Sequence, residues 1–304
     1  MNVDGGRRWS GLFPASLTVF DDDGALNLDL TGEHIAWLFA QGADGVVVGG
    51  TTGEFIAMTA DERRALTEVA VAAGAGRGSV FVNTGSYLTS ESIMLTEHAA
   101  SSGVDAALVV QPYFQRPTRD EMLAHYRAVS CAELPMLVYN IPANSAADAV
   151  SPADLGALSF EGAVQGVKST LAIPGLVDEI RVSTRADFCI LYGGIGAPIE
   201  GFASGADGWV TGLLNVALTA SLPMRDAVAA GDLRSGLHHW NEVRPLRDLV
   251  RRWISRGSGD VAVYRAILEA MGRNVGSCRL PLRPMDRESK LELHRELEAI
   301  SGDR

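Results

Sequence analysis

Residues 42–54 read G-A-D-G-V-V-V-G-G-T-T-G-E, and this stretch holds the pattern that decides the fold. Gly42 supplies the stop of a preceding helix, because glycine readily adopts the left-handed conformation found at helix ends. The uninterrupted apolar run at 45–48 predicts a short buried strand. A loop rich in glycine and threonine follows. The stretch therefore joins a helix end, a buried strand and a polar loop.

The turn into this strand recurs twice further along the chain. Residues 103–106 read G-V-D-A and residues 205–208 read G-A-D-G, each leading into an apolar run. Strand-like and helix-like segments alternate around them, and Thr59 with Glu62 has the pattern of a capping box at one helix start. The predicted strands are 12–20, 45–48, 79–82, 106–110, 136–139, 163–167, 188–192 and 208–211. Eight strands, each followed by a helix, in about 220 residues favour a (β/α)8 TIM barrel over a doubly wound sheet.

The alternation stops after residue 222, where the pattern becomes purely helical. Predicted helices there are 222–231, 237–253 and 261–271. The chain is therefore predicted to be of the α/β class, with a barrel over residues 1–222. Residues 223–304 are expected to form a C-terminal helical appendage packed on the barrel.

Composition excludes several classes of partner. The chain has 304 residues and a formal net charge of −11, which argues against nonspecific binding to nucleic acid or to an anionic membrane surface. No apolar stretch reaches the roughly 18 residues of a membrane span, and the amino terminus lacks a hydrophobic signal core. The three cysteines show neither metal-ligand spacing nor an even number. We therefore expect a cytoplasmic protein with no metal site.

Lysine is almost absent from this chain. Of 26 lysines and arginines, only Lys168 and Lys290 are lysine. Lys290 lies in a charged C-terminal segment, where a solvated helix face explains it. Lys168 follows the predicted strand 163–167, and only lysine of the two residue types becomes a neutral amine nucleophile in a protein. A lysine that extends from a strand end into solvent is the alternative.

The barrel prediction places several polar groups together, because active sites of such barrels lie at the carboxyl ends of the strands. A neutral Lys168 amine there would attack the ketone of a 2-oxo acid to form a Schiff base. Tyr139 would shuttle protons, and Thr51 with Thr52 would bind the carboxylate. Each residue also has a structural alternative: the glycine-rich loop as a simple turn, and Tyr139 as a packed core residue. The loop is not a phosphate loop, because it lacks the G-K-[ST] ending.

Three ordered motifs resemble the dihydrodipicolinate synthase / N-acetylneuraminate lyase family: residues 50–54 (G-T-T-G-E), 139–142 (Y-N-I-P) and 166–168 (G-V-K). The likeness runs from about residue 11 to residue 284. It implies a (β/α)8 barrel, a lysine imine usually formed with pyruvate, no cofactor, and commonly a homotetramer.

The resemblance also assigns roles to residues of this chain. Lys168 is the Schiff-base lysine, Tyr139 the acid/base tyrosine, and Thr51 a catalytic proton relay. The predicted substrate-binding residues are Thr52, Gly50, Gly53, Asn144, Gly194, Thr170 and Val210.

Two departures from the pattern bear on the substrate. Dihydrodipicolinate synthases typically carry an arginine where this chain has Asn144, and asparagine cannot form a charged bidentate pair with a carboxylate. They usually carry a second tyrosine where this chain has Phe114, which has no hydroxyl for a proton relay. Both departures count against that activity. Residues 194–198 (G-I-G-A-P) also lack the Asp-Glu pair with which sialic-acid lyases bind sugar hydroxyls.

The function predicted first is a class I aldolase or lyase that joins or cleaves pyruvate, or a related 2-oxo acid, and an aldehyde. Dihydrodipicolinate synthase itself, a dehydratase or deaminase of the same family, and a non-catalytic binding protein are the alternatives. We expect a homotetramer or homodimer, with small-molecule substrates and neither nucleic-acid nor membrane partners.

Overall fold

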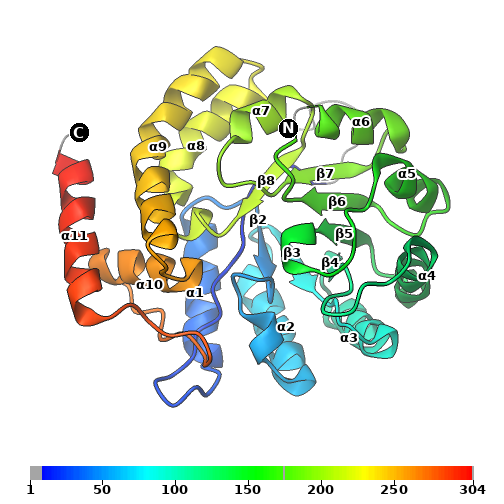
Figure 1. The fold of residues 1–304 in the computed structure, drawn as a ribbon, viewed down its shortest axis with the longest axis horizontal. Helices are drawn as coiled ribbons and strands as arrows, with labels where there is room; N and C mark the ends of the chain where they lie inside the picture. Colours follow the sequence, from blue (N-terminus) through cyan, green and yellow to red (C-terminus); the bar gives the residue numbers. More distant parts are fainter. Residues whose placement is uncertain (1–8, 174, 303–304) are drawn as a thin grey trace.

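The computed structural model describes residues 9–173 and 175–302. Eight parallel strands form one sheet in the order β1-β8-β7-β6-β5-β4-β3-β2 (Figure 1). Ala15 and Val47 bridge β1 to β2, and the Ser16 N–H donates to the Val47 carbonyl at 2.9 Å, so the sheet closes into a barrel. The strands are β1 (Gly11–Pro14), β2 (Gly45–Val48), β3 (Ser79–Asn83), β4 (Ala106–Val110), β5 (Met136–Asn140), β6 (Gly166–Ser169), β7 (Cys189–Tyr192) and β8 (Gly208–Thr211). The predicted fold class is confirmed.

Helices surround the barrel, one after each strand (Figure 1). They are α1 (Leu28–Ala40), α2 (Ala60–Gly74), α3 (Thr89–Ser102), α4 (Arg119–Val129), α5 (Pro152–Phe160), α6 (Leu176–Ser183), α7 (Pro198–Ala203) and α8 (Leu214–Ala229). The capping box of Thr59 and Glu62 is present at the start of α2. Three short 3-10 helices lie in the loops: η1 (Phe55–Ala57), η2 (Ser130–Ala132) and η3 (Pro142–Asn144).

The recurring turn has a clear structural role. Gly42, Gly103 and Gly205 have φ of 98°, 85° and 97°, the left-handed region that a glycine helix stop provides. The aspartate that follows each of them sits at the amino end of the next strand. The repeated letters in the sequence therefore mark one repeated backbone geometry, as predicted.

Polar side chains before the even-numbered strands hold the barrel together at its amino end. Asp44 Oδ2 accepts a hydrogen bond from the backbone N–H of Leu12 in β1 at 2.8 Å. Asp105 and Asp207 accept in the same way from the second residues of β3 and β7, at 2.8 and 2.7 Å. Gln165 takes this position before β6, and its Oε1 accepts from the first residue of β5 at 2.8 Å. All four even-numbered strands are thus tied to the strand before them in the chain.

The core has two layers, one inside the barrel and one between the barrel and its helices. The interior is filled by large side chains, among them Phe13, Phe81, Leu108, Leu137 and Val210. In the outer layer, the rings of Trp209 on β8 and Trp240 on α9 (Leu233–Ser255) meet edge to face, with centroids 5.6 Å apart. The barrel is therefore a packed core rather than a pore.

The C-terminal helices α9, α10 (Asp260–Ala270) and α11 (Arg287–Gly302) gather on the side of the barrel formed by α8 and α1 (Figure 1). The boundary predicted at residue 222 falls inside α8. The helix predicted to start at residue 222 begins instead at Leu214 and continues through Pro223. The eighth barrel helix thus leads directly into the helical region through a turn near residue 231.

Two strand predictions were wrong in their bounds. The first strand ends at Pro14 rather than at residue 20; the following segment stays buried but makes only isolated bridges. Lys168 lies within β6 rather than after it. In the described part of the chain, no helix is long and apolar enough to span a membrane.

Candidate active site

Lys168 is a buried residue in the middle of the sheet. Its neighbours in register are Tyr139 on β5 and Leu191 on β7, and its residue surface is only 4 % exposed. The amine Nζ lies 4.0 Å from the centroid of the Tyr139 ring. Among residues 9–173 and 175–302, no carboxylate lies within ion-pairing distance of this amine. The amine is therefore held in place without being engaged in an ion pair.

Tyr139 connects the lysine to the loop after β2. Its phenol oxygen lies 3.3 Å from the hydroxyl oxygen of Thr51, and either group is able to donate this hydrogen bond. The ring packs inside the barrel, so its position is fixed by the core. Lys168, Tyr139 and Thr51 come from three different strand ends and form one contact chain. The structure brings together the three residues predicted to be catalytic.

The loop of residues 49–54 is shaped by its glycines. Gly49 has a φ of 61°, and a side-chain carbon on Gly53 would lie 3.0 Å from the Gly49 nitrogen. A side-chain carbon on Gly50 would instead enter open space. Asn83 at the end of β3 supports the loop, because its amide donates to the Gly49 carbonyl at 2.9 Å. These contacts present Thr51 while leaving room beside it.

A buried ion pair that no sequence pattern predicted fixes the end of the same loop. Glu54 has a φ of 56°, unusual for a residue with a side chain. Its carboxylate lies 2.8 Å from Arg265 Nη2 on α10 and accepts a hydrogen bond from the Arg279 N–H at 2.9 Å. The C-terminal region therefore holds the loop that carries Thr51 and Thr52. Spacing gave no signal for this pair, because its partners are more than two hundred positions apart.

The other predicted substrate-binding residues lie in varied settings. Asn144 is exposed on η3, and Thr170 is half-buried with its hydroxyl bonded to the Asn140 carbonyl at 3.2 Å. Val210 is buried in the barrel interior, and Thr52 is buried beside Gly212. The Gly194 carbonyl accepts from the Trp209 indole N–H at 2.8 Å. Their roles stay predictions.

The carbonyl of Gly194 belongs to a tightly packed loop. A side-chain carbon on Gly194 would collide with the Tyr192 hydroxyl, so a larger residue would require the tyrosine to shift. Burial raises the pKa of Tyr192, and the negative charge of Glu200 adds to the effect. Tyr192 thus remains a neutral packing residue under this loop.

Phe114 has an exposed ring. Its φ is 76° and its residue surface is 94 % exposed. It contributes no hydroxyl to the contact chain from Lys168 to Thr51. Across the described residues, no three His, Cys, Asp or Glu side chains are grouped so as to hold a metal ion.

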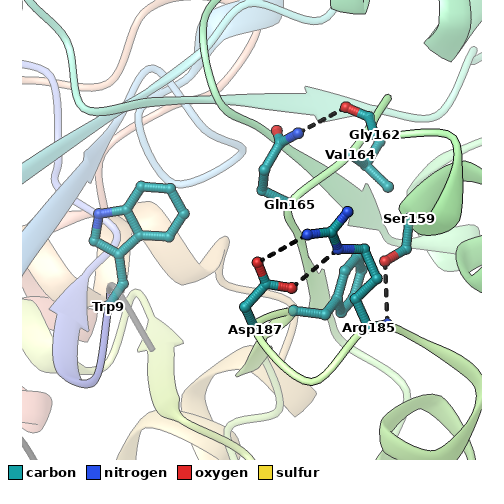
Figure 2. A pocket seen from close by; sticks show the side chains of 8 residues that line it. Trp9, Ser159, Gly162, Val164, Gln165, Arg185 and Asp187 are labelled. Atoms are coloured by element: carbon teal, nitrogen blue, oxygen red, sulfur yellow. Dashed lines mark hydrogen bonds and ion pairs between the residues drawn. The ribbon is translucent and has the colours of Figure 1, made fainter. Parts of the chain in front are cut away.

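A cavity of about 310 Å³ lies at the opposite, amino-terminal end of the barrel, beside Trp9. Figure 2 shows the Arg185 guanidinium turned toward the Asp187 carboxylate, and their Nε–Oδ1 distance is 3.2 Å. Gln165 donates to the Gly162 carbonyl at 2.8 Å in the same wall. The polar groups here bind one another, which distinguishes this cavity from the carboxyl end.

Comparison with known proteins agrees with this geometry. A profile of the dihydrodipicolinate synthetase family matches residues 8–300. This chain belongs to that family. The match to the dihydrodipicolinate synthetase family spans both the barrel and the C-terminal helices, as the resemblance of the three motifs implied. The chain is accordingly an enzyme of the family's lyase type.

Several curated and solved relatives are named as synthases of this family. The chain is 35% identical over 240 residues to the 4-hydroxy-tetrahydrodipicolinate synthase of Agrobacterium fabrum, covering 78% of this chain and 81% of that protein. It is 34% identical to the enzyme of the same name from Roseobacter denitrificans, covering 93% and 95%. The crystal structure of dihydrodipicolinate synthase from Aquifex aeolicus superposes with a TM-score of 0.89 at 26% identity, covering 96% and 98%.

Proposed function

We propose that this enzyme forms a Schiff base between Lys168 and pyruvate, or a related 2-oxo acid, and uses it in aldol condensation or cleavage with an aldehyde. The buried, unpaired Lys168 amine facing Tyr139 at the carboxyl end of the barrel carries this proposal. An amine held in an ion pair would have to break that pair before reacting. Lys168 has no such pair among the described residues.

The reaction would proceed in four steps. The Lys168 amine adds to the C2 carbonyl of pyruvate, and loss of one water gives a protonated imine. Loss of a C3 proton converts the imine to an enamine, whose carbon bonds to the aldehyde carbon while the aldehyde oxygen takes up a proton. Addition of one water releases the 4-hydroxy-2-oxo acid and restores the amine; cleavage runs the same steps in reverse.

Tyr139 and Thr51 would carry the protons of these steps. The Tyr139 ring lies 4.0 Å from the amine, which supports the proposal that its phenol protonates the departing hydroxyl of the carbinolamine. The Tyr139 phenol oxygen lies 3.3 Å from the Thr51 hydroxyl, so the proton would be able to pass between these two groups. The hydroxyls of Thr51 and Thr52 would also donate to the carboxylate of the 2-oxo acid.

The 4-hydroxy-tetrahydrodipicolinate synthase reaction, with aspartate semialdehyde as the aldehyde, is favoured by the relatives. The names of these relatives support this activity, which was an alternative rather than the first prediction from the sequence. Asn144 and Phe114 weigh against it: Asn144 is exposed and uncharged, and Phe114 has no hydroxyl. A condensation assay with aspartate semialdehyde and pyruvate separates the synthase from an aldolase with another aldehyde. Turnover of other aldehydes alone would exclude the synthase.

We propose further that the chain forms a homo-oligomer. Large apolar side chains are exposed on the loops after three consecutive strands: Ile56 after β2, Tyr87 and Leu88 after β3, and Phe114 after β4. A cluster of exposed apolar residues marks an association surface. Sedimentation velocity measures the assembly, and a monomer at micromolar concentration would contradict the proposal.

Borohydride trapping tests the imine directly. Pyruvate with borohydride should convert Lys168 into an N-carboxyethyl lysine, found by peptide mass spectrometry. Lys168→Ala should abolish the adduct and the turnover. Lys290→Ala is the matched control, because Lys290 is the only other lysine and pairs with Glu269 at 2.7 Å on a helix far along the chain. Absence of any adduct across several 2-oxo acids would rule out the Schiff-base mechanism.

A further inference from the structure

Three arginines of the described chain are almost wholly buried, and two have clear partners. Arg265 is engaged by Glu54, and its Nη2 also donates to the Thr18 carbonyl at 2.7 Å. Arg63 Nη2 donates to the carbonyls of Asn83 and Gly85 at 2.8 and 3.0 Å. Arg247 on α9 is 7 % exposed and is the third.

Arg247 lacks comparable partners. Its Nε lies 3.0 Å from Asp248 Oδ1, close enough for an ion pair but not aligned for a hydrogen bond. The guanidinium carbon lies 5.7 Å from the centroid of the Trp240 ring. Within residues 9–173 and 175–302, no acceptor binds its Nη groups. Its Nε is the only atom of this guanidinium that is both buried and without a hydrogen bond, and the two Nη groups, which carry no acceptor of the described chain, are available to one that arrives from outside it.

The free end of Arg247 meets the loop after β7. A side-chain carbon on Gly196 would lie 3.9 Å from Arg247 Nη1, and the glycine leaves that space open. The loop begins beside the strand that carries the lysine: Leu191 pairs with Lys168, and the Gly193 N–H donates to the Ser169 carbonyl at 2.7 Å. Arg247 therefore reaches the same end of the barrel as the amine.

We propose that Arg247 binds a carboxylate of the second substrate, which is then an aldehyde that carries an acid group. Paired guanidinium N–H groups suit a carboxylate because they bind both of its oxygens. The charge would come from α9 and not from the position of Asn144, which is uncharged and exposed. This inference rests on the proposed imine chemistry and adds the class of aldehyde to it.

Charge-matched aldehydes test this inference. With pyruvate as the 2-oxo acid, kcat/KM is measured for three carboxylate-bearing aldehydes: glyoxylate, succinic semialdehyde and aspartate semialdehyde. Glycolaldehyde and butanal serve as neutral counterparts. The wild type should prefer a carboxylate-bearing aldehyde. Arg247→Gln should lower kcat/KM for it by at least about 30-fold, mainly through KM, and change the neutral aldehydes less than about twofold.

Two further variants separate binding from folding. Arg247→Lys keeps the positive charge but lacks the paired N–H groups of a guanidinium. It should therefore retain part of the kcat/KM that Arg247→Gln loses. Arg244→Gln on the same helix removes an exposed arginine bonded to Asn241 and should change neither substrate class. Borohydride trapping with pyruvate should be unaffected in all three variants.

The outcomes distinguish this inference from the proposed function. Failure of trapping in the wild type would remove the imine itself. With trapping intact, the Arg247 inference is overturned if the neutral aldehydes react as well as the acidic ones, if no acidic aldehyde reacts, or if Arg247→Gln weakens both classes equally.

Discussion

The two ends of the barrel differ in how their buried polar groups are partnered. At the amino end, Asp44, Asp105, Gln165 and Asp207 each accept a hydrogen bond from the strand before them. At the carboxyl end, the amine of Lys168 has no carboxylate partner in the described chain. Arg247 likewise keeps donors free there. Paired groups at one end stabilise the closed sheet, whereas the Lys168 amine and the Nη donors of Arg247 have no acceptor of the described chain at the other end, although Arg247 Nε lies 3.0 Å from Asp248.

This difference follows from what each end must do. An unsatisfied buried donor costs about 1–3 kcal/mol, and the chain retains some without a proposed role, such as the Tyr126 hydroxyl; at the carboxyl end, free donors have the further purpose of meeting a substrate under the proposed function. The amino end has no such purpose, and even its cavity is lined by groups that bind one another, as Arg185 and Asp187 do. We therefore expect substitutions at the carboxyl end to affect rate, and substitutions at the amino end to affect stability.

Tyr139→Phe should give the largest effect, and that effect should be on kcat. A loss of stability instead would contradict the difference between the two ends of the barrel. Loss of the phenol oxygen removes the proposed proton donor, so kcat should fall by about 10²–10⁴-fold. The free energy of unfolding should change little, because the ring that packs in the barrel is kept. Steady-state kinetics and urea unfolding measure the two quantities.

A second tyrosine gives the matched control for this change. Tyr126 on α4 is wholly buried, its hydroxyl has no hydrogen-bond partner among the described groups, and burial raises its pKa. Tyr126→Phe should leave kcat within about twofold of the wild type. Equal losses of kcat in the two variants would show that the Tyr139 effect is not chemical.

Much of the fold was predictable because local chemistry repeats. The glycine stops before the apolar strands at residues 45–48, 106–110 and 208–211, together with the alternation of strand-like and helix-like segments between them, predicted eight units and hence the barrel. Gln165 was missed as the fourth member of the amino-end set, because it shares neither the residue type nor the spacing of the aspartates. The first strand was predicted too long, because residues 15–20 are as apolar as a strand but leave the ladder.

The site was predictable only in part. Lys168 stood out because the chain has so few lysines, and strand order placed Tyr139 and Thr51 near it. Arg247 could not stand out among 24 arginines, since its distinction is a lack of partners that only packing reveals. Glu54 with Arg265 joins distant segments, and no local pattern encodes that contact.

Asp207→Ala should give the next largest effect, this time on stability. The change removes the acceptor of the Ile190 N–H and the partner of Arg181, whose Nη2 lies 2.6 Å from the Asp207 carboxylate. The Ile190 N–H loses its acceptor, and Arg181 loses its counter-charge while keeping its hydrogen bonds to the Phe188 and Gly205 carbonyls. The free energy of unfolding should therefore fall by about 3 kcal/mol. Urea unfolding checks this value.

An exposed ion pair at the same end of the barrel provides the control. Asp187 pairs with Arg185 on the surface, so Asp187→Ala should cost less than about 1 kcal/mol. Both variants should keep the kcat of the wild type per folded molecule. A fall in kcat for Asp207→Ala without a loss of stability would contradict the division between the two ends.

His34 tests whether every unpaired buried group near the carboxyl end has a function. It is a buried polar residue there with an unpaired atom and no proposed role in catalysis. Its Nε2 lies 2.9 Å from the Asn215 side-chain oxygen, while its Nδ1 has no hydrogen-bond partner in the described chain. Burial lowers the pKa of His34 to about 4, against the hydrogen bond to Asn215, which raises it. The folded protein therefore keeps this ring neutral at pH 5.

In the unfolded chain, the ring takes up a proton below about pH 6.5, so acid favours unfolding. The stabilising contribution of His34 should be complete above pH 6.5 and decline as the pH falls toward 4. Between pH 7 and pH 5 the loss should be about 2 kcal/mol. Urea unfolding at both pH values measures it, and His34→Gln should remove this part of the pH dependence while leaving kcat at pH 7 unchanged. A large loss of kcat in His34→Gln would contradict a purely structural role for His34, whereas the predicted result leaves Lys168 and Arg247 as the groups with free donors that are proposed to act at this end.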